Sequence, residues 1–185
     1  YKVEPPVVFY GSSITQGACA TRPGTCCEAW VSRAIGCDYI NLGFAGNARG
    51  ESAIVNYMAG LEMSAFVCDY DHNAPNPAHL RATHAPLYRA IRAAHPDIPF
   101  IMLTKPDYKF GVSDYDARRA VVMETFRMAQ AGGDRNVYFI DGASLFGGDG
   151  MDCTADGCHP TDLGFYRMAE KIIPVLRAAL GKNES

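Results

Sequence analysis

The sequence predicts an α/β protein with a parallel sheet that is covered by helices on both faces. Short apolar runs alternate with longer segments of helical periodicity along the whole chain. Strands that alternate with helices at this spacing form βαβ units, which make neighbouring strands parallel. The runs themselves are almost continuously apolar, as is typical of strands that are buried on both faces.

Five strands and five helices are expected in alternation. The strands span Val7–Tyr10, Asp38–Leu42, Ala65–Tyr70, Pro99–Leu103 and Val137–Ile140, and the helices span Cys26–Ile35, Glu51–Ala59, Pro77–Ala94, Asp114–Ala131 and Leu163–Leu180. Gly36, Gly60 and Gly181 directly follow three of these helices, and glycine is common where helices end. Because no repeat, low-complexity tract or linker interrupts the alternation, residues 1–185 are expected to form one domain.

Composition excludes several classes of function. The 20 acidic and 17 basic residues give a net charge of -3, which argues against a nucleic-acid surface because phosphate binding needs clustered Lys and Arg. No apolar run approaches the roughly 20 residues that cross a bilayer. We therefore expect neither nucleic acid nor a membrane as a partner.

The cysteines favour a reducing compartment. The chain has seven of them, an odd number, and no pair has the C-x-x-C spacing of a zinc or redox motif. Reduced thiols in a cytoplasmic protein are the expectation. No signal peptide is recognisable, but the chain begins at Tyr1, so a removed leader and a preceding domain both stay compatible with the sequence.

Two loops carry the residue types that acyl transfer needs. Ligands of open parallel sheets bind outside the carboxyl ends of the strands. There the first strand runs into Ser12 and Ser13, while Asp156 and His159 lie in the loop before the last helix. A serine after a strand is usually only a helix cap, and Asp-x-x-His is common by chance. In combination, the loops supply a nucleophile, a base and an orienting acid.

Two further loops offer donors for a developing oxyanion. The segment that contains Gly46 has three glycines and can bring a backbone N–H close to a ligand, and Asn73 can add a side-chain amide. An ordinary turn is the alternative for each. Asp71 and His72 are potential metal ligands, as is Asp69, but no second ligand group of matching type accompanies them, so no metal is expected.

The order of these segments resembles the SGNH, or GDSL-type, esterase and acylhydrolase family from about Val7 to Leu180. Gly11-Ser12-Ser13 looks like its first block, although the usual Gly-Asp-Ser is Gly-Ser-Ser here. The resemblance implies a catalytic triad and an oxyanion hole, the latter including the Ser13 backbone N–H. Their members would be Ser13, Asp156 and His159 for the triad, and Ser13, Gly46 and Asn73 for the oxyanion hole.

The third block departs from the family pattern, since Asp69-Tyr70-Asp71-His72-Asn73 replaces Gly-x-Asn-Asp. The resemblance also implies a three-layer α/β/α, flavodoxin-like fold with a five-stranded parallel sheet. The pattern is most similar to a branch of the family whose catalytic domain often follows an N-terminal β-sandwich.

The expected function is a serine esterase that acts on small O-acyl esters, in particular O-acetyl esters of carbohydrate-like alcohols, without a cofactor. An acyltransferase with the same triad is one alternative, and an inactive carbohydrate-binding or interaction domain is another. Arg22, Arg49, Lys105 and Tyr108 lie in loops that face the site and are candidate contacts to the alcohol group. Solvated surface charge is the alternative for each basic residue. The sequence leaves the oligomeric state open.

Overall fold

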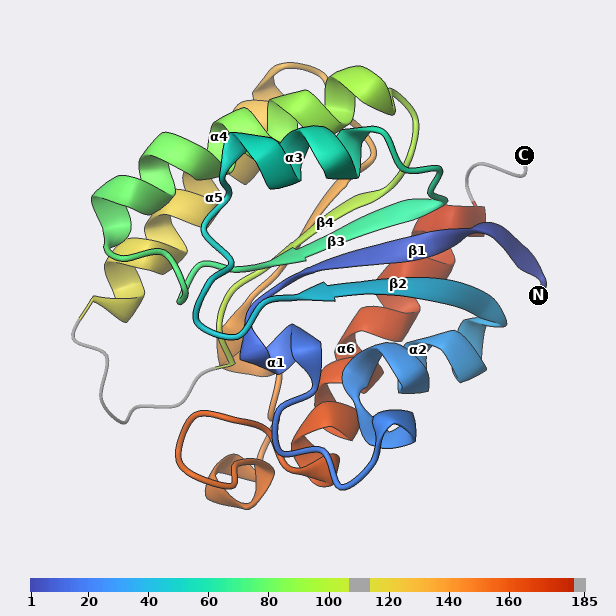
Figure 1. Cartoon of the computed structure of the whole chain (residues 1–185), viewed down its shortest axis with the longest axis vertical. Helices are drawn as coiled ribbons and strands as arrows, with labels where there is room; N and C mark the ends of the chain where they lie inside the picture. Colours follow the sequence, from blue (N-terminus) through green and yellow to red (C-terminus); the bar gives the residue numbers. More distant parts are fainter. Residues whose placement is uncertain (107–113, 182–185) are drawn as a thin grey trace.

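The computed structural model describes residues 1–106 and 114–181, in which five parallel strands form one sheet (Figure 1). The strands are β1 (Val3–Gly11), β2 (Cys37–Gly43), β3 (Ala65–Asp69), β4 (Phe100–Leu103) and β5 (Val137–Ile140). Their order in the sheet is β2-β1-β3-β4-β5. This flavodoxin-like order reverses direction between β1 and β3, and ligands of such sheets bind at the carboxyl ends beside that point.

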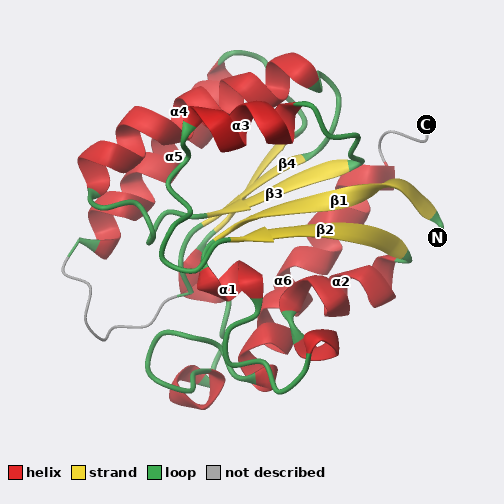
Figure 2. Cartoon of the chain, in the orientation of Figure 1, coloured by secondary structure: helices red, strands yellow, loops and turns green. Residues whose placement is uncertain are grey.

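Helices cover both faces of the sheet, as Figure 2 shows. On one face lie α3 (Ser52–Ala59), α4 (Pro77–Ala94) and α5 (Tyr115–Ala131), and on the other lie α2 (Cys27–Ile35) and α6 (Asp162–Gly181). The sheet separates two apolar cores, and the side chains of β1 alternate between them. Val8 and Tyr10 belong to the core on the α4 side, whereas Val7 and Phe9 belong to the core on the α6 side. The predicted three-layer α/β/α class is thereby confirmed.

The elements agree with the expected ones to within a few residues, except at the start of the chain. Strand β1 begins at Val3, where Val3 pairs with Cys37, and its register shifts before Val7. Pro5 and Pro6 occupy the interval and have no N–H to donate to a ladder, which explains why the apolar pattern begins later than the strand. A short helix, α1 (Ser13–Gln16), and three 3₁₀ turns lie in segments expected to be irregular.

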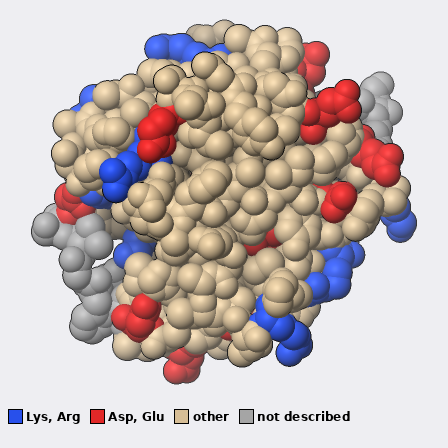
Figure 3. All heavy atoms as spheres, viewed as in Figure 1, with Lys and Arg blue, Asp and Glu red and all other residues tan. Residues whose placement is uncertain are grey.

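Charged side chains lie mainly around the margin of the face in Figure 3, where both acidic and basic groups are present. The middle of this view lies over the edge strand β2 and is largely uncharged (Figures 1 and 3). None of the helices within residues 1–106 and 114–181 has the length and apolar character to cross a membrane.

Candidate active site

The two adjacent serines in the turn after β1 have different roles. Ser12 is fully buried and caps α1, because its hydroxyl oxygen accepts a hydrogen bond from the Ile14 N–H at 3.0 Å. Its own N–H donates to the Asp69 carbonyl at 3.1 Å. Gly11 has no side chain to keep this carbonyl away, and a Cβ there would overlap it. The cap is therefore Ser12, which leaves the Ser13 hydroxyl for another partner.

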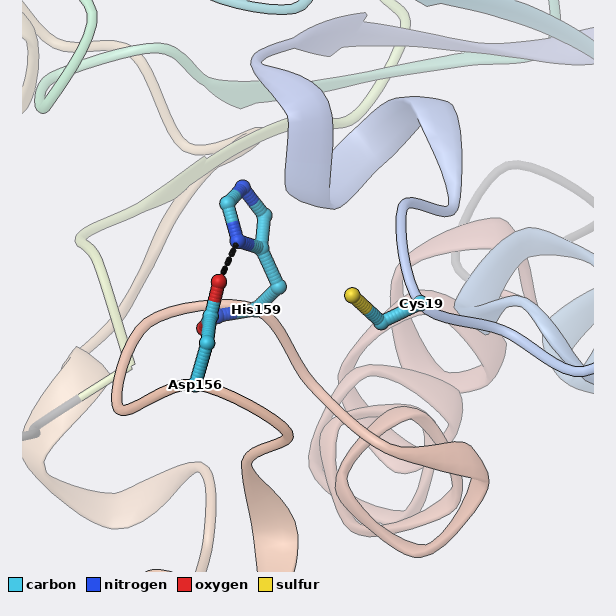
Figure 4. A group of neighbouring side chains, drawn as sticks. All are labelled: Cys19, Asp156 and His159. Atoms are coloured by element: carbon cyan, nitrogen blue, oxygen red, sulfur yellow. Dashed lines mark hydrogen bonds and ion pairs between the residues drawn. The ribbon is translucent and has the colours of Figure 1, made fainter.

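That partner is His159. The Ser13 Oγ lies 2.9 Å from His159 Nε2, and His159 Nδ1 lies 2.6 Å from Asp156 Oδ2 (Figure 4 shows the Asp156–His159 pair). A carboxylate at Nδ1 favours the tautomer that carries its proton there, so Nε2 is the nitrogen that accepts from Ser13. The structure thus brings together the three residues that the sequence grouped as a triad.

The loop itself holds Asp156 in its ionised form. Asp156 Oδ1 accepts hydrogen bonds from the backbone N–H groups of His159 at 2.7 Å and Cys158 at 2.9 Å. The backbone hydrogen bond from His159 is the largest cause that lowers the pKa of Asp156 to about 2, and the side-chain bond to the imidazole adds to it. Gly157 has a φ of 83°, which favours glycine and lets the chain turn back so tightly. A carboxylate is consequently present at Nδ1 at neutral pH.

A second acid joins this loop to the segment after α1. Asp162, the first residue of α6, accepts hydrogen bonds from the Thr21 N–H at 2.9 Å, the Thr21 hydroxyl at 2.5 Å and the Thr25 hydroxyl at 2.7 Å. These bonds tie residues near Ser13 to the residue three positions after His159. The sequence analysis missed this role, since an acid in the first turn of a helix is common for local reasons alone.

The loops of the two predicted oxyanion donors contact each other. The Ala48 N–H donates to Asn73 Oδ1 at 3.4 Å, which uses the carbonyl side of this amide and leaves its NH₂ side as the donor. Gly46 has a φ of 70°, and an added Cβ would meet nothing within 4 Å, so its backbone borders open space. Gly43, at the end of β2, packs directly on the backbone of Gln16 in α1. The Gly46 loop thus contacts the Asn73 loop, and the end of β2 that leads into it packs on α1, the helix that begins with Ser13.

Arg118 of α5 donates hydrogen bonds to the backbone of the Asn73 loop and so holds the loop in place. Its buried Nη1 donates to the backbone carbonyls of Asp71 at 2.6 Å and Ala74 at 2.7 Å, one on each side of Asn73. Its Nε donates to Asp114 Oδ1 at 2.8 Å, which fixes the guanidinium in turn. Sequence reasoning did not find Arg118, because nothing local distinguishes it from the other arginines of that helix.

The candidate substrate contacts have different surroundings. Arg22 is exposed and lines a cavity of about 370 Å³ beside α1, which Tyr39 and Asn41 also line. Arg49 is also exposed and donates to the Gly46 carbonyl at 3.4 Å. Lys105, in contrast, is 5% exposed, so its side chain is not presented to solvent, and its backbone N–H donates to Asp71 Oδ2 at 3.2 Å.

Tyr108, the fourth candidate contact, lies outside the described residues.

Solved structures share this fold. A protein of Bacteroides ovatus described as a GDSL-like lipase is 32% identical, with a TM-score of 0.85 over 96% of this chain and 54% of its own. The salicylyl-acyltransferase SsfX3 of a tetracycline biosynthetic pathway is 23% identical, with a TM-score of 0.81 over 97% of this chain and 55% of its own. A family two carbohydrate esterase of Clostridium thermocellum, solved with cellohexaose, is 18% identical, with a TM-score of 0.76 over 97% and 65%.

The chain thus spans about half to two thirds of the length of these three proteins. No curated protein matches its sequence. The sequence profile of the GDSL-like lipase/acylhydrolase family, however, matches residues 4–177, which include every element from β1 to most of α6. The chain therefore belongs to the GDSL-like lipase/acylhydrolase family of serine hydrolases.

Proposed function

We propose that the protein is a serine esterase that hydrolyses small O-acyl esters, in particular O-acetyl esters of carbohydrates. The observation that carries this proposal is the continuous chain of contacts from Ser13 through His159 to Asp156. A hydroxyl that faces an imidazole, which in turn faces a carboxylate, is the arrangement that turns a serine into a nucleophile.

In the first half of the reaction, Ser13 Oγ attacks the ester carbonyl carbon while His159 Nε2 takes the hydroxyl proton. Asp156 stabilises the imidazolium that forms and stays ionised itself. The tetrahedral oxyanion accepts hydrogen bonds from the backbone N–H groups of Ser13 and Gly46 and from the Asn73 amide. The bond to the alcohol oxygen then breaks, and this oxygen leaves with the proton from His159.

In the second half, water attacks the acyl-serine. His159 takes a proton from this water and returns it to Ser13 Oγ as the acid leaves. The nucleophile, the base and the oxyanion donors all belong to the chain, so the proposed hydrolysis uses no cofactor.

Several features support a short acyl group and a polar alcohol. The described loops around Ser13 are rich in Gly, Asp and Asn, and none of the described segments is a long apolar insertion that would form a lid over a lipid chain. Arg22 and Arg49 are exposed near the site and are suited to contact hydroxyl or acyl oxygens. The similar structures include an esterase solved with cellohexaose and a two-domain esterase active on acetylated mannans.

Acyl transfer to an alcohol is the second candidate, since a salicylyl-acyltransferase has a TM-score of 0.81 to this chain. Transfer uses the same acyl-serine and differs only in the acceptor, which takes the place of water. An inactive carbohydrate-binding domain is less well supported, because the three contacting side chains would then have no use.

The test is a series of p-nitrophenyl esters from acetyl to dodecanoyl together with acetylated sugars, each run with wild type and Ser13→Ala. We expect kcat/KM to be greatest for acetyl and the kcat of Ser13→Ala to be lower than that of wild type by about 10⁵–10⁶. A maximum at octanoyl or beyond would overturn the short-acyl assignment. Adding alcohols and sugars at increasing concentration then separates the two reactions, because transfer yields a new ester at the expense of free acid.

A further inference from the structure

A cysteine that the proposed mechanism does not use lies beside the triad. Cys19 follows α1, is the exposed one among the seven cysteines, and has a φ of 72°, in the left-handed region. Figure 4 shows its thiol pointing toward the pair formed by Asp156 and His159. The Cys19 sulfur, a carboxylate oxygen of Asp156 and a ring nitrogen of His159 all lie within 4.8 Å of one another.

These three atoms are the ligand types that Zn²⁺ prefers. Zinc sites that keep an open position commonly use three protein ligands from thiolate, imidazole and carboxylate, with water as the fourth. Ligand atoms on a tetrahedral zinc ion lie about 3.5 Å apart, so a pair at the 4.8 Å limit has to close by about 1 Å, whereas Asp156 Oδ2 and His159 Nδ1, now 2.6 Å apart, have to separate by about 1 Å. The exposed thiol and the half-exposed Asp156 carboxylate have room for such small rotations.

We propose that Cys19, Asp156 and His159 form an inhibitory site for a soft or borderline divalent cation, represented by Zn²⁺. The inhibition rests on the proposed esterase function, but binding does not. Thiolate and carboxylate together balance the charge of the ion, and the thiol proton leaves to solvent when the metal binds.

Inhibition follows because both nitrogens of His159 already serve the triad. Nδ1 faces Asp156 and Nε2 faces Ser13. An ion on Nε2 takes the lone pair that must accept the serine proton. An ion on Nδ1 requires the tautomer that carries the imidazole proton on Nε2, so the proton moves from Nδ1 to Nε2, which then has no lone pair to accept the serine proton, and the orienting hydrogen bond to Asp156 is lost. In either arrangement His159 no longer acts as the base.

A second group of potential metal ligands is less suited to bind a cation. Asp69, Asp71 and His72 also place ligand atoms within 4.8 Å of one another, but both carboxylates are buried. Burial raises the pKa of Asp69 to about 6, while the nearby Lys105 ammonium acts in the opposite direction, and the Lys105 backbone N–H donates to Asp71 Oδ2. The lysine therefore already supplies a positive charge near this group. None of the three members of the Cys19 group is a lysine or an arginine.

Binding is measured first, by calorimetry with Zn²⁺ and by absorption with Co²⁺ in its place, on reduced protein freed of metal. The variants are Cys19→Ser, Cys158→Ser as the matched control, and Ser13→Ala, which has no esterase step. We expect a thiolate-to-cobalt charge-transfer band in wild type, Cys158→Ser and Ser13→Ala. Cys19→Ser should lack the band and bind Zn²⁺ at least about 10-fold more weakly, since even the loss of an outer partner costs roughly that much.

Inhibition is measured second. Zn²⁺ should inhibit ester hydrolysis by wild type and Cys158→Ser at the concentration at which it binds, a chelator should restore the activity, and Cys19→Ser should be at least about 10-fold less sensitive. Equal zinc affinity of Cys19→Ser and wild type, or no charge-transfer band in wild type, would overturn the inference. A band in a protein without esterase activity would instead leave the metal site standing and refute the proposed function.

Discussion

His159 places its Nε2 atom 2.9 Å from the hydroxyl oxygen of Ser13, although 146 positions separate the two residues along the chain. The contact exists because β1 ends beside the loop that precedes α6. The three hydrogen bonds that Asp162 accepts from Thr21 and Thr25 join the two segments. The geometry of the triad is therefore a property of the tertiary structure, and each member can be tested separately.

Asp156→Asn should lower kcat by about 10⁴, in line with the same change in other triads, because an amide stabilises the wrong tautomer of the imidazole. His159→Ala should cost nearly as much as loss of the nucleophile. Asp152→Asn is the matched control, since Asp152 is an exposed acid of the same loop and should retain full activity. The measurement is kcat/KM for p-nitrophenyl acetate. A loss of less than tenfold in Asp156→Asn would remove Asp156 from the triad.

Asn73→Ala should lower kcat by roughly 10²–10³ with little change in KM, because an oxyanion donor acts mainly in the transition state. Asn76→Ala is the contrast. Asn76 caps α4 by accepting from the His79 N–H at 2.8 Å, so its loss should lower stability by about 1 kcal/mol and leave kcat unchanged. An effect of Asn73→Ala on KM alone would mean that another group donates to the oxyanion.

Arg118→Met should lower kcat by up to about 10²-fold, because it frees the carbonyls on both sides of Asn73 and lets the donor move. Arg118→Lys should restore part of this loss, and Arg127→Met on the exposed side of α5 should have no effect. Circular dichroism establishes that each variant is folded.

The double variant Asn73→Ala/Arg118→Met tests whether Arg118 acts by positioning Asn73. If Arg118 acts through Asn73, then Arg118→Met should have little further effect on kcat once Asn73 is alanine. Independent, additive losses would show that Arg118 supports the fold and not the oxyanion donor.

Glu28 should make stability depend on pH. It is 2% exposed, and with Asp69 it borders a cavity of about 10 Å³ beneath α1. Burial raises the pKa of Glu28 to about 8 and that of Asp69 to about 6. The other titratable groups that interact with Glu28 are Cys26, Cys27 and Tyr39, and burial raises the pKa of each of these as well.

The direction of this pH dependence follows from the number of protons that the folded and the unfolded states bind. Between about pH 5 and 8 the folded protein keeps a proton on Glu28 that the unfolded chain has released, so stability falls as pH rises and levels off above this range. Glu28→Gln removes the contribution of Glu28 to this dependence and leaves that of Asp69. Its free energy of unfolding, measured against wild type in urea, should rise by on the order of 3 kcal/mol across that range. A difference that does not change with pH would contradict the assignment.

Much of the fold was predictable because local patterns specify it. Helix α4 spans Pro77–Ala94 as expected, since Asn76 caps it and Pro77 occupies its first position. The rule that ligands gather at the carboxyl ends of parallel strands also brought Ser13 and His159 into one predicted site. Helix α1 was missed because four residues are too few to show a helical period.

The supporting residues were beyond the reach of local patterns. Arg118 reaches the Asn73 loop from a helix more than 40 positions away, and Asp162 reaches Thr21 across 141 positions. Lys105 is likewise buried, although a lysine in a loop after a strand is expected to be exposed.

We expect Ser13, and not the adjacent Ser12, to carry the acyl group. To test this, the enzyme is quenched in acid during turnover of p-nitrophenyl acetate, and the masses of the intact protein and of its peptides are measured. Wild type and Ser12→Ala should both show the added mass of one acetyl group on Ser13, and the main defect of Ser12→Ala should be the loss of a helix cap worth about 1 kcal/mol. Ser13→Ala should show no adduct and a kcat lower by about 10⁵–10⁶. Acetyl on Ser12, or an adduct in Ser13→Ala with its activity retained, would contradict the account.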